Sequence, residues 1–234
     1  MKKQSLLLSG MKDGIPIALG YLSVSFGFGI TAVGLGISVL NSFIISLTNL
    51  TSAGQAQGVS IIAANGSLLE MALVQLIINM RYALMAISLS QNLDKSFRLR
   101  HRLIAAYGIT DEIFAVCATR KEPIKPMYMY GIIIVSTAGW TSGTVLGASA
   151  GTLLPSNLIS AFGIMLYGMF LAIIIPPAKK SFSVLLVIMV SAGLSTICKY
   201  LLPFISGGFT VIICGIAASL IGALLFPVGE EKKA

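Results

Sequence analysis

The stretch Gly208–Phe226, GFTVIICGIAASLIGALLF, contains 19 residues and no charged side chain. A helix needs about 20 apolar residues to cross the hydrocarbon core of a bilayer. The rest of the chain has the same character, because 56% of its 234 residues are hydrophobic and 10% are charged. A soluble domain has about 25% charged residues. The sequence therefore predicts an all-α, multi-pass integral membrane protein.

Seven more apolar segments precede this one, which gives about eight transmembrane segments in a single transmembrane domain, 1–234. The segments are Gly14–Gly36, Ser42–Ala64, Leu68–Ser90, Leu103–Thr119, Tyr128–Ala150, Asn157–Ile175, Phe182–Leu202 and Gly208–Phe226. Prolines stand at the ends of the later segments, where a residue that interrupts a helix is tolerated. The fourth segment is the shortest and most polar, and it is interpreted either as a short span or as a re-entrant element buried in protein.

Composition argues against several classes of protein. The net charge of +8 is typical of a membrane protein whose Lys and Arg collect on the cytoplasmic side, so no nucleic acid is expected as a partner. The only histidine, His101, lies in a basic loop, and the three cysteines are scattered through apolar runs. No metal site or other cofactor is expected. The chain is not expected to be an enzyme, because catalysis needs a nucleophile paired with a base.

The distribution of Lys and Arg predicts the orientation. If all eight segments cross, the side of the N-terminus holds ten basic residues and the opposite side holds five. This count favours cytoplasmic N- and C-termini. The basic cluster at 95–102 is the exception. If the fourth segment does not cross, this cluster shares a side with the Arg120–Lys125 loop.

A weak internal repeat is visible at an offset of 90 residues. Thr51-Ser52-Ala53-Gly54 in the second segment corresponds to Thr141-Ser142-Gly143 in the fifth. Two three-helix units, 12–92 and 102–178, followed by two C-terminal helices over 182–226, would explain the similarity. Units with an odd number of helices insert in opposite orientations, as in many secondary transporters. Chance similarity between segments rich in Gly, Ser and Thr is the alternative.

The centre of the second segment is unusually polar. Thr48–Gly58, TNLTSAGQAQG, has one large apolar side chain in 11 positions. Such a run favours a helix that breaks and turns its free backbone groups toward a cavity. The ends of the two half-helices would then lie near the midplane, where they suit an anionic or zwitterionic substrate. A tightly packed interface of small residues is the alternative.

Charged residues deep in the third and fourth segments are the next candidates. Arg81 is deep in the third segment, where an arginine costs about 2.5–3.5 kcal/mol on insertion scales and needs a partner. The pair Asp111-Glu112 supplies two carboxylates. We expect Asp111 to pair with Arg81, and we expect Glu112 to be the more exposed group, which exchanges protons and whose pKa burial would raise. A structural ion pair that only holds two helices together is the alternative.

The fifth segment carries glycines at positions 139, 143, 147 and 151. Because the spacing is four residues, they form a stripe along one helix face that permits close packing against another helix. Trp140 is the only tryptophan. It is interpreted either as an interfacial anchor or as part of a substrate path.

These motifs together resemble the AzlC family, the large subunit of bacterial branched-chain amino acid exporters. The resemblance rests on Thr51-Ser52-Ala53-Gly54-Gln55, Asn79-Met80-Arg81-Tyr82, Thr110-Asp111-Glu112-Ile113-Phe114, and Gly139-Trp140 with Gly143-Thr144. It implies a place in the bacterial cell (inner) membrane and efflux of leucine, isoleucine and valine. It also implies a small hydrophobic membrane subunit of the AzlD type as a partner. The substrate-binding residues expected from the resemblance and the polar motifs are Thr51, Ser52, Gly54, Gln55, Asn79 and Arg81.

The sequence thus favours a proton-coupled secondary transporter that exports apolar amino acids. The substrate's side chain would lie against residues such as Phe26, Phe28 and Ile30. The alternative function is the membrane substrate-binding subunit of a vitamin importer that a separate ATPase drives. A neighbouring gene for an ATPase would favour the importer, and one for a protein of about 100 apolar residues would favour the exporter, since about four membrane spans fit that length.

Overall fold

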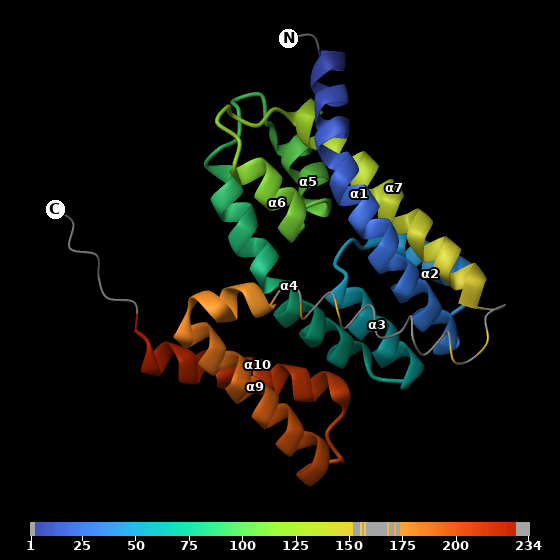
Figure 1. Cartoon of the computed structure of the whole chain (residues 1–234), viewed down its shortest axis with the longest axis vertical. Coiled ribbons are helices and arrows are strands. Elements are labelled where there is room, and N and C mark those ends of the chain that lie inside the picture. The colour runs from blue at the N-terminus through green and yellow to red at the C-terminus, as the bar shows by residue number, and fades with distance from the viewer. Residues whose placement is uncertain are drawn as a thin grey trace.

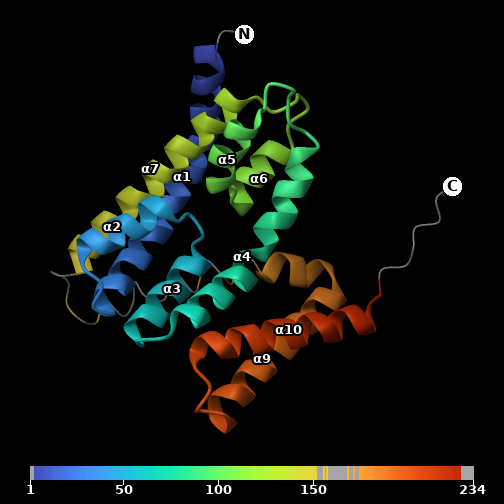
Figure 2. The same ribbon diagram turned by 180° about the vertical axis from the view of Figure 1, so that it is seen from behind.

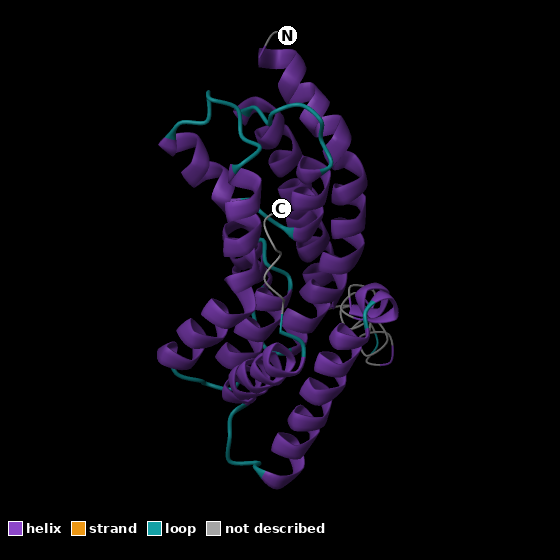
Figure 3. Ribbon diagram, turned by 90° about the vertical axis from the view of Figure 1, so that its left-hand side faces the viewer, coloured by secondary structure: helices purple, strands orange, loops and turns teal. Residues whose placement is uncertain are grey.

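The structure is a computed structural model, and it describes residues 3–151, 155, 157, 168, 171 and 174–227. Every named element in that part of the chain is a helix (Figure 3). Five helices are long and apolar enough to cross a membrane: α1 (Lys3–Gly34), α4 (Leu68–Ser90), α7 (Pro126–Gly151), α9 (Phe182–Leu201) and α10 (Gly207–Leu225). The prediction of an all-α membrane protein is confirmed. The predicted sixth segment, Asn157–Ile175, lies almost entirely outside the described residues.

The second and fourth predicted segments are each divided into two short helices. The second consists of α2 (Val39–Thr48) and α3 (Ala53–Ala63), and the fourth consists of α5 (Leu99–Tyr107) and α6 (Asp111–Ala118). None of the four reaches the length of about 20 residues that a crossing requires. Of the two interpretations of the fourth segment, the structure therefore favours the re-entrant element over the short span. The break expected within 48–58 is present.

Both pairs fold back on themselves as re-entrant hairpins. The chain enters and leaves the α2–α3 hairpin at the end of the molecule where α1 and α7 finish (Figures 1 and 2). The α5–α6 hairpin enters and leaves at the opposite end, where an isolated bridge joins Leu93 to Ile124. The two tips approach each other in the interior. Beside them, at the surface, the hydroxyl of Tyr107, the last residue of α5, donates a hydrogen bond to the carbonyl oxygen of Leu47 in α2 at 2.6 Å.

Helices α1 and α7 run side by side in the same direction (Figure 1), and both hairpins pack against them. A Cβ added at Gly139, Gly143 or Gly147 would overlap backbone atoms of Ala18, Leu22 or Phe26, respectively, in α1. Only glycine allows the two backbones to approach this closely. The packing role predicted for the glycine stripe is confirmed at these three positions.

Apart from Arg81, the basic residues within the described range 3–151 collect at one end of the molecule. Asp13 at the start of α1 lies 3.9 Å from Arg120 and accepts a hydrogen bond from Tyr128. The Leu93–Ile124 bridge brings the basic cluster at 95–102 to the same end. The connections 35–38 and 64–67, at the other end, contain no Lys or Arg. The cluster is therefore no exception to the positive-inside rule, and the rule predicts that this end is cytoplasmic.

Glu70 serves the packing of the C-terminal helices. It is buried near the start of α4 and accepts a hydrogen bond from Ser206, the N-cap residue of α10. A carboxylate is favourable at this place because the N-terminus of a helix carries partial positive charge. A Cβ at Gly208 would overlap the Glu70 side chain. Glu70 therefore connects α4 to α10 and lies away from the hairpin tips.

Candidate functional site

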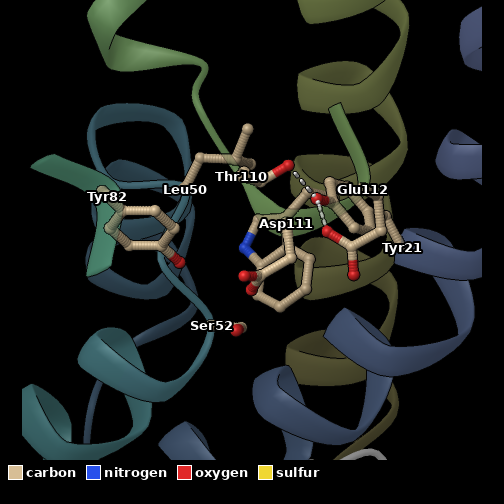
Figure 4. Close-up of a pocket in the computed structure, with 8 residues that line it drawn as sticks. Tyr21, Leu50, Ser52, Tyr82, Thr110, Asp111 and Glu112 are labelled. Atoms are coloured by element: carbon tan, nitrogen blue, oxygen red, sulfur yellow. Dashed lines mark hydrogen bonds between the residues drawn. The ribbon is translucent and has the colours of Figure 1, made fainter. Parts of the chain in front are cut away.

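The tips of the two hairpins enclose a small cavity in the middle of the molecule. It is lined by Tyr21, Leu50, Ser52, Tyr82, Thr110, Asp111, Glu112 and Trp140, which come from α1, both hairpins, α4 and α7. Figure 4 shows the labelled side chains gathered around this space. Its volume is about 10 Å³, which corresponds to about one water molecule. The space is too small for an amino acid in this structure.

Arg81 lies beside the cavity and is paired with Asp111. Its Nη1 atom is 2.8 Å from Asp111 Oδ2, and the two side chains are 36% and 37% exposed. The ion pair expected from the sequence is therefore present. Arg81 Nη2 also donates to the Tyr82 hydroxyl at 3.1 Å, and the guanidinium lies 4.9 Å from the centre of that ring. Arg81 Nε is buried without a hydrogen-bond partner among the described residues.

Glu112 turns toward α1 and meets Tyr21. The Tyr21 hydroxyl is 2.5 Å from Glu112 Oε2 and 2.6 Å from the side-chain oxygen of Thr110. A phenol has one proton, so it donates to only one of these oxygens at a time. Thr110 is also the N-cap of α6 and accepts the Ile113 N–H. The two adjacent carboxylates thus have different partners. Asp111 pairs with Arg81, and Glu112 contacts the hydroxyl of Tyr21.

The tip of the α2–α3 hairpin is strained at Ser52. This residue has φ 42° and ψ −80°, which non-glycine residues rarely adopt. It occupies the N-cap position of α3, but its side chain makes no capping hydrogen bond. The partly positive N-terminus of α3 therefore lies next to the cavity without a side-chain cap. Strained residues of this kind cluster at ligand sites and switch regions.

Two hydrogen bonds in series connect this tip to polar side chains of α4. Gln75 Nε2 donates to the carbonyl oxygen of Gly54 at 2.7 Å, and Asn79 Nδ2 donates to Gln75 Oε1 at 3.0 Å. Thr51 donates locally to Asn49. A Cβ at Gly54 would lie 2.7 Å from Gln75 Oε1. Gly54, Thr51 and Asn79 thus shape and hold the tip, and they do not line the cavity.

Gln55 points away from the cavity, toward α7. It is 1% exposed and donates to Ser46, which is 2.7 Å from Thr144. Its Oε1 atom has no hydrogen-bond partner in the described part of the chain. Gln55 therefore belongs to a buried polar contact between the α2–α3 hairpin and α7.

The expected apolar pocket is placed differently in the structure. Phe28 and Ile30 are 1% exposed and do not line the cavity. The Phe28 ring lies behind Trp140, with the ring centres 6.5 Å apart. The apolar surface of the cavity comes instead from Leu50 and from the rings of Tyr21, Tyr82 and Trp140.

Sequence reasoning missed Tyr21 and left Trp140 undecided. Trp140 is 2% exposed and contacts Tyr21 edge-on at 5.3 Å, so it is not an interfacial anchor. A signal for Tyr21 existed, because it is the only tyrosine in the segment 14–36. Its hydroxyl needs a polar partner in the membrane interior, and Glu112 and Thr110 supply it.

Comparisons with known proteins agree on one family. The model of the AzlC protein family matches residues 16–154. An "uncharacterized membrane protein" of Archaeoglobus fulgidus is 30% identical over 227 residues, which cover 96% of each chain. The inner membrane protein YgaZ of Escherichia coli is 29% identical over 224 residues, 92% of this chain and 90% of that one. No solved structure matches.

Proposed function

Because the chain belongs to the AzlC protein family, we propose that it is a secondary transporter that exports branched-chain amino acids and is coupled to protons. The observation that carries the proposal is the small cavity in the middle of a membrane protein, where two re-entrant hairpins from opposite ends meet an arginine and two carboxylates. Ionisable groups at membrane depth typically mark substrate and proton pathways.

The groups around the cavity complement a zwitterion with an apolar side chain. The carboxylate of the substrate would bind Arg81 and the uncapped N-terminus of α3 at Ser52, since helix N-termini favour anions. Its ammonium group would bind Asp111, which would exchange Arg81 for the substrate. Its branched side chain would pack on Leu50 and on the aromatic rings that line the cavity.

A cavity of this size cannot hold an amino acid, so transport requires the tips to separate. Movement of the α5–α6 hairpin would open the site toward the basic end of the molecule, and movement of the α2–α3 hairpin would open it toward the other end. The hydrogen bond from Tyr107 to Leu47 and the pair Arg81–Asp111 would have to break in at least one of these states. This scheme gives alternating access around a fixed site.

The order of elements supports a repeat different from the one expected from sequence. A re-entrant hairpin followed by a long helix occurs as α2–α3–α4 and again as α5–α6–α7. The hairpins enter from opposite ends, and α4 and α7 run in opposite directions (Figure 1). Tyr82 of α4 and Trp140 of α7 both line the cavity. We place the inverted repeat here, in preference to 12–92 and 102–178.

AzlC proteins pair with small membrane subunits, and we propose a hydrophobic AzlD-type subunit as the partner of this chain. Co-purification in a mild detergent tests for the complex. Full export by the chain alone in reconstituted vesicles would show that the partner is dispensable.

The deciding experiment measures uptake of labelled leucine into inverted membrane vesicles, with and without an imposed pH gradient. We expect the gradient to drive uptake. Arg81→Ala should abolish it at equal membrane abundance, because the substrate carboxylate loses its cation. Arg98→Ala is the matched control, since Arg98 is exposed at the basic end and does not line the cavity.

Two results would contradict the proposal. Normal leucine uptake with Arg81→Ala would remove the arginine from the mechanism. Transport that ignores the pH gradient but requires ATP and a separate ATPase would favour the importer subunit considered in the sequence analysis.

A further inference from the structure

An apolar groove lies between the C-terminal half of α4 and α5 and is separate from the cavity between the hairpin tips. Its volume is about 290 Å³, and Met129 of α7 contributes to its lining. All the other lining residues are apolar except Ser90 and Arg102. They are Ala86, Leu89, Ser90, Leu93, Phe97, Arg102, Leu103, Ala105, Ala106 and Ile109. The outer residues Leu103 and Ala106 are exposed, so the groove is open to the surrounding membrane.

The one charged group of the groove, Arg102, stands at its basic end. Arg102 Nε donates to the carbonyl oxygen of Phe97 at 3.3 Å, and this is the only hydrogen bond of its side chain among the described residues. No carboxylate in the described residues forms an ion pair with Arg102. The groove therefore combines an apolar body with an unneutralised guanidinium at the end that the positive-inside rule assigns to the cytoplasm.

Few acidic residues compete for Arg102 at this end of the molecule. Asp13 and Glu122 both lie against Arg120. Asp94 accepts two hydrogen bonds from Ser96, and these bonds lower the pKa of its carboxyl group. Basic residues therefore exceed acidic ones here, and basic pockets on the cytoplasmic side of membrane proteins attract anionic head groups.

We propose that this groove binds an anionic phospholipid, with one acyl chain along the apolar lining and the phosphate paired with Arg102. The acyl chain explains the apolar body of the groove, and the phosphate explains the cation. A zwitterionic lipid is a poorer occupant because its amine meets the same excess of positive charge. A free phosphate is also poorer because it leaves the apolar lining unfilled.

The test measures how phosphatidylglycerol raises the melting temperature of the full chain purified in a mild detergent. Phosphatidylcholine with the same acyl chains, and glycerol phosphate, are titrated in parallel. We expect phosphatidylglycerol to give the largest rise. Arg102→Gln should weaken its binding roughly fivefold, as expected for one interfacial cation. Ala106→Phe should remove the effect by filling the groove. Arg98→Gln, at an exposed cation outside the groove, should leave binding unchanged.

Each other outcome overturns the proposal in a recognisable way. Equal losses with Arg98→Gln and Arg102→Gln would mean that only diffuse charge attracts the lipid. An equal response to glycerol phosphate would mean a simple anion site. If Ala106→Phe leaves the lipid response intact but loses a co-purifying small subunit, the groove belongs to that subunit. Native mass spectrometry of bound lipid gives the same comparison if a variant melts too early to titrate.

Discussion

The contact between Arg81 and Asp111 can be measured with a double-mutant cycle of Arg81→Gln and Asp111→Asn. The atoms are 2.8 Å apart and each side chain is about one third exposed. Exposed ion pairs contribute about 0.2–1 kcal/mol, whereas breaking a buried pair costs about 3–5 kcal/mol. For a half-buried pair with a short, charge-assisted hydrogen bond we expect a coupling energy of about 1–2 kcal/mol. Each single change leaves one charge without its partner. The double variant should therefore be destabilised by less than the sum of the two single changes, and the difference is the coupling energy.

The chain contains a matched control for this cycle. Arg120 and Asp13 are the same two residue types, but their atoms lie 3.9 Å apart at the basic end of the molecule. Their coupling energy should be below about 0.5 kcal/mol. Free energies of unfolding are measured in mixed micelles of increasing denaturing detergent. A coupling energy near zero for Arg81 and Asp111, equal to the control, would refute the ion pair.

Export by the same variants separates the two roles of the pair. If Arg81 only holds α4 against the α5–α6 hairpin, the double variant should recover both stability and leucine export. If Arg81 binds the substrate carboxylate, the double variant should recover stability and remain inactive. The second result is the one that the proposed function requires.

Three further predictions concern packing, proton coupling and topology. Gly147→Ala should lower the free energy of unfolding by about 2 kcal/mol or more, because its Cβ would overlap the backbone of Phe26 and the helices would have to separate. The control Gly20→Ala, with nothing within 4 Å, should be neutral or stabilising by up to about 1 kcal/mol. Equal melting temperatures of the two variants would contradict the close packing. Glu112→Gln should leave leucine binding intact and make export insensitive to an imposed pH gradient, and Tyr21→Phe should weaken the same response; export by Glu112→Gln that follows the gradient like the unmodified protein would remove the proton role. The variants Lys95→Cys and Lys121→Cys should react with an impermeant thiol reagent only in inverted vesicles. Leu35→Cys should react only in right-side-out vesicles. Labelling of positions 95 and 121 from opposite faces would disprove the re-entrant α5–α6 hairpin.

Much of the fold follows from where apolar runs begin and end. The five long helices correspond to five predicted segments, because an uninterrupted apolar run leaves the backbone no alternative to an α-helix in lipid. The polar run Thr48–Gly58 correctly predicts a break for the same reason. It does not reveal that the chain then turns back, since a crossing broken helix and a hairpin bury the same small residues.

The sequence predicts those residues of the site whose charge needs a partner in the membrane. It does not predict the residues whose orientation depends on tertiary packing. Arg81 and Asp111 are conspicuous because each is costly alone in the membrane. The direction of Gln55 toward α7 and the exclusion of Phe28 from the cavity depend on how the α2–α3 hairpin packs against α7. A hairpin that turns back changes which face of each half-helix meets its neighbour, and no local pattern encodes this orientation.

One bond between the hairpins also satisfies a backbone group that the break in the second segment leaves free. Tyr107 of the α5–α6 hairpin donates to the carbonyl of Leu47 in the last turn of α2. Such a bond contributes about 0.5–1.5 kcal/mol net, but a carbonyl freed away from water costs about 1–3 kcal/mol. Separation of the tips is therefore unfavourable unless something replaces the lost donor. The ammonium group of an amino acid is such a donor, and its carboxylate can accept from the uncapped end of α3. Opening and substrate binding would then be favourable only together, which is the coupling that a transporter needs to avoid a leak.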